Sequence, residues 1–336
     1  MAQDQTNYKI LSGKSVLDID DQIYANRFTD YRNLWQNAPR QEIVTNFPLN
    51  VDVELTNACN LRCPHCARTH DNWGCSSIGF MDIDLATKII KEINQEQSGC
   101  IKFSLRGEPL LYRKIINIID LIDSNNVLDY YFNTNAVELT PELSKRFIDV
   151  GLPRISISVG GWDKRSFEEC QVGAKFETVL NNVKQLKQIR DAQKAIKPKI
   201  RIQAVLKPEL YAHFEEFKNL WGPFADEIGG IDFREETTDS TMFNRYDDFK
   251  CNFLWQRLVV LWDGSVYPCL FHGIKNPQDI LLGNVRNTTL KELWHSQKMN
   301  YIRQLHSTEK SYLCNSCVAC SYRKTEILKK LKEKEH

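Results

Sequence analysis

The segment VDVELTNACNLRCPHCART, residues 51–69, decides the fold. It opens with alternating apolar and polar residues, VDVELT, which predict a β-strand over 51–56. Three cysteines follow directly at C-x3-C-x2-C spacing: Cys59, Cys63 and Cys66. Thiolates are the protein ligands of iron–sulfur clusters, so three of them can hold three irons of a cubane and leave the fourth iron open. A catalytic metal site needs such an open position, although a zinc knuckle or unrelated buried thiols remain alternatives.

Downstream of this segment, short β-rich runs alternate with helix-like stretches. The further expected strands are 101–105, 130–134, 154–159, 200–206 and 227–233. The expected helices are 82–96, 112–124, 141–151, 176–192 and 209–222. Strands separated by helices of this length indicate βαβ units and a parallel sheet. The predicted fold class is therefore α/β: a partial (β/α)6 TIM-like barrel, with its active site at the carboxyl ends of the strands.

The length of the chain, 336 residues, suits one large domain and a smaller one. We expect an N-terminal lead-in over 1–49, the barrel over 50–240, a small cysteine-rich metal-cluster domain over 245–325 and a charged tail over 326–336. The 44 basic and 43 acidic residues give a net charge of +1. No global field therefore favours a nucleic-acid partner.

The apolar residues are scattered through the chain. No apolar stretch reaches the roughly 18 residues that span a bilayer, and the first 21 residues contain no apolar core of signal-peptide length. We therefore expect no membrane partner and a cytoplasmic location, where thiols stay reduced. In that compartment, eleven cysteines favour metal ligation over disulfides.

The cysteine loop resembles the signature of the radical S-adenosylmethionine (radical SAM) superfamily, C-x3-C-x-aromatic-C after the first strand, with His65 at the aromatic position. The resemblance implies a [4Fe-4S] cluster on Cys59, Cys63 and Cys66, whose open iron is chelated by S-adenosylmethionine, with His65 near the adenine. It also implies reductive cleavage of that cofactor to a 5′-deoxyadenosyl radical, which abstracts hydrogen from a substrate. A flavodoxin- or ferredoxin-type protein is the electron donor that this chemistry implies.

Two further segments resemble cofactor-binding motifs of this superfamily. RGEPLLY (106–112) follows the second expected strand and resembles G-G-E-P, which contacts the methionine amino group; Gly107 and Glu108 are the matching positions. FNTNA (132–136) resembles T-N-G and places Asn135 in the cofactor site. A simple turn is the structural alternative for the first motif.

The strand ISISVGG (155–161) resembles S-x-D-G and implies that Ser158 binds the ribose or carboxylate of the cofactor, although a plain strand serine is an equal alternative. Many relatives carry an arginine after this strand for the cofactor carboxylate, and this chain has Gln171 near that position. We expect Arg201 to serve instead, because a guanidinium binds a carboxylate bidentately. A salt bridge is the alternative role for Arg201.

The C-terminal cysteines resemble a SPASM/twitch extension, with a G-x4-C segment, an L-G-N-V segment before a helix and a terminal C-x2-C. The resemblance implies an auxiliary [4Fe-4S] cluster, with zinc as the alternative. We expect four ligands, with Cys320 as the spare or the substitute for one of the last pair: Cys251, Cys269, Cys314 and Cys317. An oxidised auxiliary cluster can accept an electron from a substrate radical.

These resemblances predict a radical SAM oxidoreductase or epimerase that acts on a small polyol, sugar or nucleotide-sugar. Modification of a ribosomally made peptide is the second hypothesis; residues 1–49 are short and weakly patterned for a leader-peptide domain. A non-catalytic zinc-binding interaction protein is the third. The sequence leaves open the substrate, whether S-adenosylmethionine is consumed or regenerated, and the oligomeric state.

Overall fold

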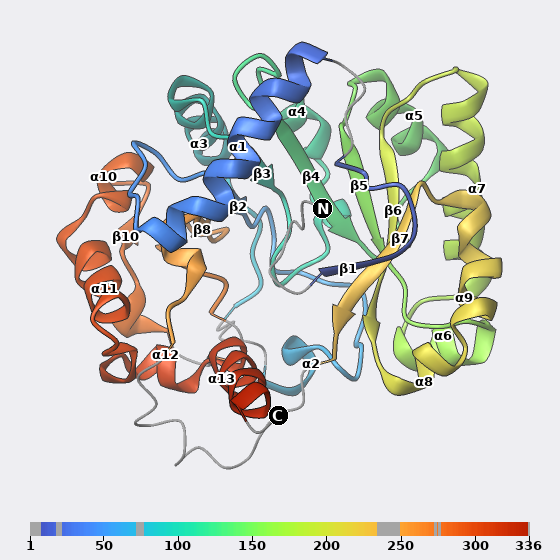
Figure 1. Cartoon of the computed structure of the whole chain (residues 1–336). Coiled ribbons are helices and arrows are strands. Elements are labelled where there is room, and N and C mark those ends of the chain that lie inside the picture. The colour runs from blue at the N-terminus through green and yellow to red at the C-terminus, as the bar shows by residue number, and fades with distance from the viewer. Residues whose placement is uncertain are drawn as a thin grey trace.

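A computed structural model describes residues 8–17, 22–71, 77–233, 249–271, 274 and 277–334 (Figure 1). Within these ranges one ten-stranded sheet has the order β1-β7-β6-β5-β4-β3-β2-β8-β9-β10. The strands are β1 (Tyr8–Gly13), β2 (Asn50–Val53), β3 (Cys100–Lys102), β4 (Asp129–Thr134), β5 (Arg154–Ser158), β6 (Lys199–Leu206), β7 (Glu227–Asp232), β8 (Arg257–Val260), β9 (Ser265–Tyr267) and β10 (Gly283–Asn284).

Thirteen α-helices and five short 3-10 helices of the described residues accompany the sheet. The α-helices are α1 (Gln22–Gln41), α2 (Ala67–Asp71), α3 (Ile83–Glu96), α4 (Ile115–Ile119), α5 (Pro141–Asp149), α6 (Lys164–Cys170), α7 (Phe176–Ala192), α8 (Pro208–Ala212), α9 (Phe214–Trp221), α10 (Leu290–Trp294), α11 (Gln297–Ser307), α12 (Asn315–Ala319) and α13 (Ser321–Lys334). The 3-10 helices are η2 (Pro109–Leu111), η3 (Gly222–Phe224), η5 (Asn252–Trp255), η6 (Gln278–Ile280) and η7 (Ser311–Leu313).

The α/β class and the partial barrel are confirmed: β2 to β7 are the six expected strands, and each pairs in parallel with the next. The expected helix 82–96 is α3, which begins where the Asp82 carboxylate caps the backbone N–H groups of Asp84 and Leu85. The helix expected over 112–124 is shorter, and that over 209–222 is divided between α8 and α9.

The lead-in contains structure that the sequence analysis did not anticipate. Strand β1 adds antiparallel to β7 at one edge of the sheet, and α1 runs for 20 residues. The main-chain oxygen of Trp35 in α1 accepts a hydrogen bond from the buried Gln256 side chain, 2.8 Å away. The lead-in therefore covers the sheet rather than preceding it as a loop.

The C-terminal segment continues the sheet. Strand β8 pairs in parallel with β2, so it occupies the place beside the first barrel strand, and β9 and β10 follow antiparallel. Figure 1 shows β8 and β10 with α10, α11 and α12 grouped on the side of the molecule opposite α5 and α7. The domain boundary expected between 240 and 245 lies outside the described residues.

The two faces of the parallel strands differ in polarity. In β5, Ile155 and Ile157 point to the face that the helices cover, beside Phe132 of β4, whose ring centroid lies 5.0 Å from that of Phe147 in α5. Ser156 and Ser158 alternate with them and therefore point to the inner face of the barrel.

The charged side chains of the inner face are paired. Asp52 accepts a hydrogen bond from Arg257 at 2.9 Å and lies 3.9 Å from Lys102. Asp129 pairs with Arg154 at 2.6 Å. Pairing of this kind offsets the cost of removing charges from water. Within the described residues, no helix is long and apolar enough to cross a membrane.

We expect Arg257→Met to destabilise the protein by about 3–5 kcal/mol, because it leaves the buried Asp52 carboxylate without its nearest cation. Lys145→Ala is the matched control, since it removes an exposed ion pair with Asp149 and should cost less than about 1 kcal/mol. Urea denaturation followed by tryptophan fluorescence measures both. Equal stability of the two variants would contradict a role for this pair.

Candidate active site

The cysteine loop begins at the carboxyl end of β2 and ends at α2. Cys59, Cys63 and Cys66 are half-buried free thiols. Burial, with smaller contributions from Cys66 and Cys59 because thiolates repel one another, raises the pKa of Cys63 to about 12. Burial also raises the pKa of Cys59. The thiols are thus close enough to interact, and a bound cation is needed to hold them as thiolates near neutral pH.

The thiols are not gathered at one point. Among the described residues, no three Cys, His, Asp or Glu side chains come close enough together to hold a single metal ion. A cubane binds each thiolate through a different iron, whereas one zinc ion requires all of its ligands at about 2.0–2.3 Å.

The G-E-P turn after β3 lies against the cysteine loop. The N–H group of Glu108 donates to the main-chain oxygen of Ala58 at 2.7 Å. A Cβ atom on Gly107 would lie 2.3 Å from the main-chain oxygen of Thr56 and 2.6 Å from that of Ala58. Only glycine allows this approach of two backbones.

The Glu108 carboxylate joins the same turn to the end of β4. It accepts hydrogen bonds from Thr134 Oγ1 at 2.7 Å, from the N–H of Asn135 at 2.8 Å and from the N–H of Leu110 at 3.1 Å. Burial raises the pKa of Glu108 to about 7, although these hydrogen bonds oppose the shift. Asn135 in turn donates from Nδ2 to Asn60 Oδ1 in the cysteine loop at 2.8 Å. The motifs expected at Gly107, Glu108 and Asn135 therefore meet at the loop; their contact with a cofactor stays a prediction.

Arg106, which replaces the first glycine of G-G-E-P, forms a buried bidentate pair with Glu54. Its Nε and Nη2 atoms lie 2.7 and 2.6 Å from the two carboxylate oxygens. Glu54 is the first residue after β2, so the pair fixes the base of the cysteine loop to the turn after β3. Sequence reasoning missed this partner, because the two residues lie on different strands.

Ser158 lies at the carboxyl end of β5, where its Oγ accepts a hydrogen bond from Gln203 Nε2 at 3.1 Å. Gln171 closes the loop that follows: its Nε2 donates to the main-chain oxygen of Ser158 and its Oε1 accepts from the N–H of Gly160. Cys170 lies near Gly160, and it contributes to the raised pKa of Cys63. Cys75 lies outside the described residues.

Arg201 requires a correction. It is the third residue of β6, near the amino end of that strand, and pairs with the buried Glu227 at 2.6 Å. Tyr8 of β1 covers the guanidinium, whose carbon lies 4.4 Å from the ring centroid. Arg201 is therefore a buried structural residue near the amino end of its strand, and its salt bridge is buried rather than at the surface, where the alternative had placed one.

Lys207, which sequence reasoning did not single out, lies directly after β6 at the carboxyl edge. Its charge lowers the pKa of His65, after the larger effect of burial, so the two side chains are neighbours. His65 Nδ1 is buried and has no hydrogen-bond partner among the described residues. The Lys207 ammonium lies over the Phe233 ring, 5.1 Å from its centroid.

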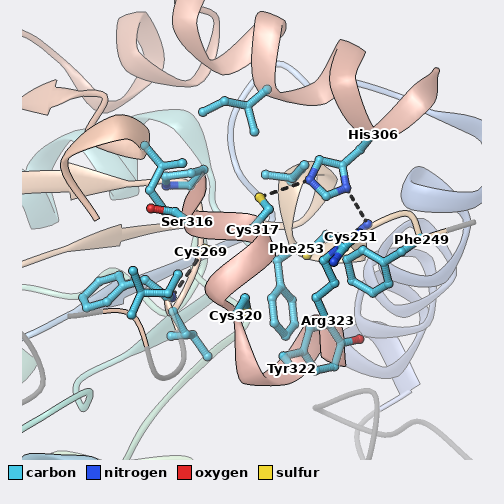
Figure 2. A pocket seen from close by; sticks show the side chains of 17 residues that line it. Phe249, Cys251, Phe253, Cys269, His306, Ser316, Cys317, Cys320, Tyr322 and Arg323 are labelled. Carbon is cyan, nitrogen blue, oxygen red and sulfur yellow. Dashed lines mark hydrogen bonds between the residues drawn. The ribbon is translucent and has the colours of Figure 1, made fainter. Parts of the chain in front are cut away.

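A second cysteine group lies in the C-terminal segment (Figure 2). Cys251, Cys269, Cys317 and Cys320 line one pocket with apolar neighbours that include Phe253 and Tyr322. Burial raises the pKa of Cys251 to about 12 and that of Cys269 well above its ordinary value.

Cys314 does not line this pocket. Its Sγ lies 3.7 Å from Asp279 Oδ2, to which the N–H of Ser316 also donates at 2.9 Å. A side-chain hydrogen bond with Cys317 lowers the pKa of Cys314 from its ordinary value, although burial and Asp279 oppose the shift. The environment of Cys314 thus differs from that of the four pocket cysteines.

The two sites are connected through Phe271. The guanidinium carbon of Arg106 lies 5.8 Å from the centroid of the Phe271 ring. The Phe271 N–H in turn donates to Cys269 Sγ at 3.4 Å. The turn that supports the cysteine loop is therefore in contact with the second cysteine group.

Comparison with known proteins identifies both parts of the chain. A model of the radical SAM superfamily matches residues 53–217, and one of the SPASM iron–sulfur cluster-binding domain matches residues 251–321. A cofactor-modifying protein for a tungsten-containing aldehyde ferredoxin oxidoreductase, from Pyrococcus furiosus, is 23% identical over 81% of this chain and 86% of its own length. A probable GTP 3′,8-cyclase from Methanocaldococcus jannaschii is 28% identical, over 39% of this chain and 43% of its own.

Solved structures share the fold. Streptococcus suis SuiB bound to S-adenosylmethionine has a TM-score of 0.63 at 15% identity, over 90% of this chain and 78% of that chain. The enzyme anSMEcpe with bound AdoMet has a TM-score of 0.58 at 18% identity, covering 82% and 88%. BtrN in complex with AdoMet and 2-DOIA has a TM-score of 0.50 at 18% identity, covering 81% and 93%. The chain belongs to the radical SAM superfamily, and with its SPASM region it takes a [4Fe-4S] cluster with S-adenosylmethionine and an auxiliary iron–sulfur cluster.

Proposed function

We propose that this enzyme is a radical SAM oxidoreductase that removes hydrogen from a small polyol or sugar and passes an electron to its auxiliary cluster. When bound, the catalytic cluster and S-adenosylmethionine supply a 5′-deoxyadenosyl radical as the hydrogen acceptor. Cys59, Cys63 and Cys66 are the proposed ligands of the catalytic cluster. The turn at Gly107 and Glu108 supports their loop, because its backbone lies in close contact with the backbone of the loop.

The observation that carries the substrate class is the polarity of the inner face at the carboxyl ends of β4 to β6. Asn133, Ser156, Ser158 and Gln203 are neutral there, and Asn133 Oδ1 and Ser156 Oγ are buried without hydrogen-bond partners among the described residues. The interior charges below them are paired with one another. A surface of amides and hydroxyls suits the hydroxyl groups of a polyol, because each can donate and accept.

Lys207 is the proposed partner of the cofactor carboxylate in place of Arg201. It stands at the active-site edge beside His65, and a cation there also suits the phosphate of a nucleotide-sugar. By name, the GTP 3′,8-cyclases act on a nucleotide, which supports a small-molecule substrate over a peptide. His65 is proposed to lie near the adenine, with its buried Nδ1 available as a hydrogen-bonding group.

The proposed ligands of the auxiliary cluster are the four pocket cysteines, Cys251, Cys269, Cys317 and Cys320. This set replaces the one expected from sequence, which used Cys314 in place of Cys320. The lining of the pocket supports the exchange, because Cys320 lines it and Cys314 does not. An auxiliary cluster beside the active site supports oxidation rather than epimerisation as the outcome.

We expect the protein, reconstituted anaerobically and reduced with dithionite, to bind about eight irons and to form 5′-deoxyadenosine. With a fully deuterated polyol substrate, 5′-deoxyadenosine gains deuterium, as mass spectrometry detects. Cys63→Ala should lose about four irons and all 5′-deoxyadenosine, because one ligand of the catalytic cluster is missing. Cys100→Ser is the control, since Cys100 is buried beside Asp129 outside both sites. Deuterium transfer from a peptide, with none from any polyol or sugar, would reject the substrate class.

Two substitutions distinguish Cys314 from Cys320 as the fourth ligand of the auxiliary cluster. Cys320→Ser should reduce the iron content by about four per chain. Cys314→Ser should retain full iron, because serine keeps the hydrogen bond to Asp279. Iron analysis with EPR of the reduced proteins measures both. The reverse result would restore Cys314 as the ligand.

We expect Gly107→Ala to displace the cysteine loop, because its Cβ would stand 2.3 Å from the Thr56 oxygen. The loss of about four irons, with the auxiliary EPR signal retained, is the expected result. Gly222→Ala is the matched control: its new Cβ would meet nothing closer than 3.6 Å. A Gly107→Ala protein with full iron content would show that the close approach is dispensable.

A further inference from the structure

His306 is a buried side chain of α11 whose two ring nitrogens face two different cysteines of the pocket (Figure 2). Its Nδ1 lies 3.2 Å from the backbone nitrogen of Cys251, and its Nε2 lies 3.4 Å from Cys317 Sγ. The Phe249 ring packs edge-on against the imidazole, with 5.9 Å between centroids. The imidazole is therefore held in one orientation between two elements.

The contact with Cys251 determines which nitrogen carries the proton. A backbone N–H group is only a donor, so Nδ1 must accept and carries no proton. The ring proton of the neutral imidazole is then on Nε2, which points at Cys317 Sγ. A sulfur that ligates a cluster accepts such a bond readily, because it is a thiolate.

We infer that His306 is a positioning residue of the auxiliary cluster. It fixes the positions of Cys251 and Cys317 relative to each other, and it raises the reduction potential of the cluster through an Nε2–H···S bond to Cys317. The inference rests on the proposed auxiliary cluster. A hydrogen bond to a ligand sulfur withdraws electron density and favours the reduced cluster, which carries one more negative charge. A higher potential makes the cluster a better acceptor for the electron left on a substrate radical.

A second N–H group also donates to a cysteine sulfur of this pocket, and the same reasoning gives it the same effect on the reduction potential. The backbone N–H of Phe271 donates to Cys269 Sγ at 3.4 Å. That bond comes from the main chain and cannot be removed by a side-chain substitution. His306 is therefore a side chain through which the potential of this cluster can be changed while its four cysteines are kept.

The test uses the Cys63→Ala protein, in which the auxiliary cluster is the expected source of the EPR signal. A potentiometric titration followed by EPR gives its midpoint potential. His306→Leu removes the donor and should shift the midpoint to a more negative value with the iron content unchanged. His306→Gln keeps an amide N–H of similar reach and should restore much of the shift. His295→Gln is the matched control, because His295 is exposed and bonds the main-chain oxygen of Asn46.

A potential in His306→Leu equal to that of the parent, at full iron content, would overturn the role of His306 alone. Absence of iron from the parent would overturn the auxiliary cluster and the inference with it. Should His306→Leu lose its iron, parent protein labelled with 15N-histidine decides the matter. Pulsed EPR should then detect a nitrogen coupled to the cluster, and a spectrum without that coupling would reject the bond.

Discussion

The buried pair of Glu54 and Arg106 fixes the geometry on which both cysteine groups depend. Glu54 directly follows the strand that leads into the cysteine loop, and Arg106 begins the turn that supports this loop after the neighbouring strand. Both charges are removed from water, so separating them would leave an uncompensated charge in the interior. The same guanidinium lies against Phe271, beside Cys269. A displacement of either cysteine group therefore disturbs a contact that it shares with the other. The position of one group relative to the other is fixed in this way.

Side chains of the parallel strands alternate between two faces, so that one face forms the apolar core and the other faces the inside of the barrel. Isoleucines of β5 and β6 face the helices and supply the apolar core, whereas the serines and glutamine between them face the inside of the barrel. Charged groups on that inner face occur in pairs near the amino ends of the strands, where no ligand is expected. Neutral groups follow toward the carboxyl ends. The strand period of two thus builds a rigid base beneath a polar binding surface.

The sequence predicts the six barrel strands and the cysteine loop well, because period-two patterning and C-x3-C-x2-C spacing are local signals. It misses β1 and α1, since their apolar residues are spaced irregularly and their partners are distant in sequence: β1 pairs with β7, and α1 contacts Gly99 and Gln256. The role given to Arg201 fails for a related reason: its partner Glu227 lies on the next strand, and no local pattern reveals that pairing. The choice among Cys314, Cys317 and Cys320 is equally invisible, because their even spacing gives each the same local signature. The folded pocket distinguishes them, because Cys317 and Cys320 line it and Cys314 does not.

The last helix packs against the second cysteine group. Helix α13 begins directly after Cys320, and its Tyr322 stacks on Phe253 with 5.0 Å between ring centroids. The apolar cluster formed by Phe249, Phe253, Tyr322 and Ile327 is small, and the cysteines pack directly against it. Burial raises the pKa of the Cys251 and Cys269 thiols, and a shared metal cluster would turn such thiols into crosslinks between the segments that carry them. The position of α13 is therefore fixed by the segment that carries the second cysteine group, and β8 connects that segment to the barrel by pairing with β2 on one side and β9 on the other.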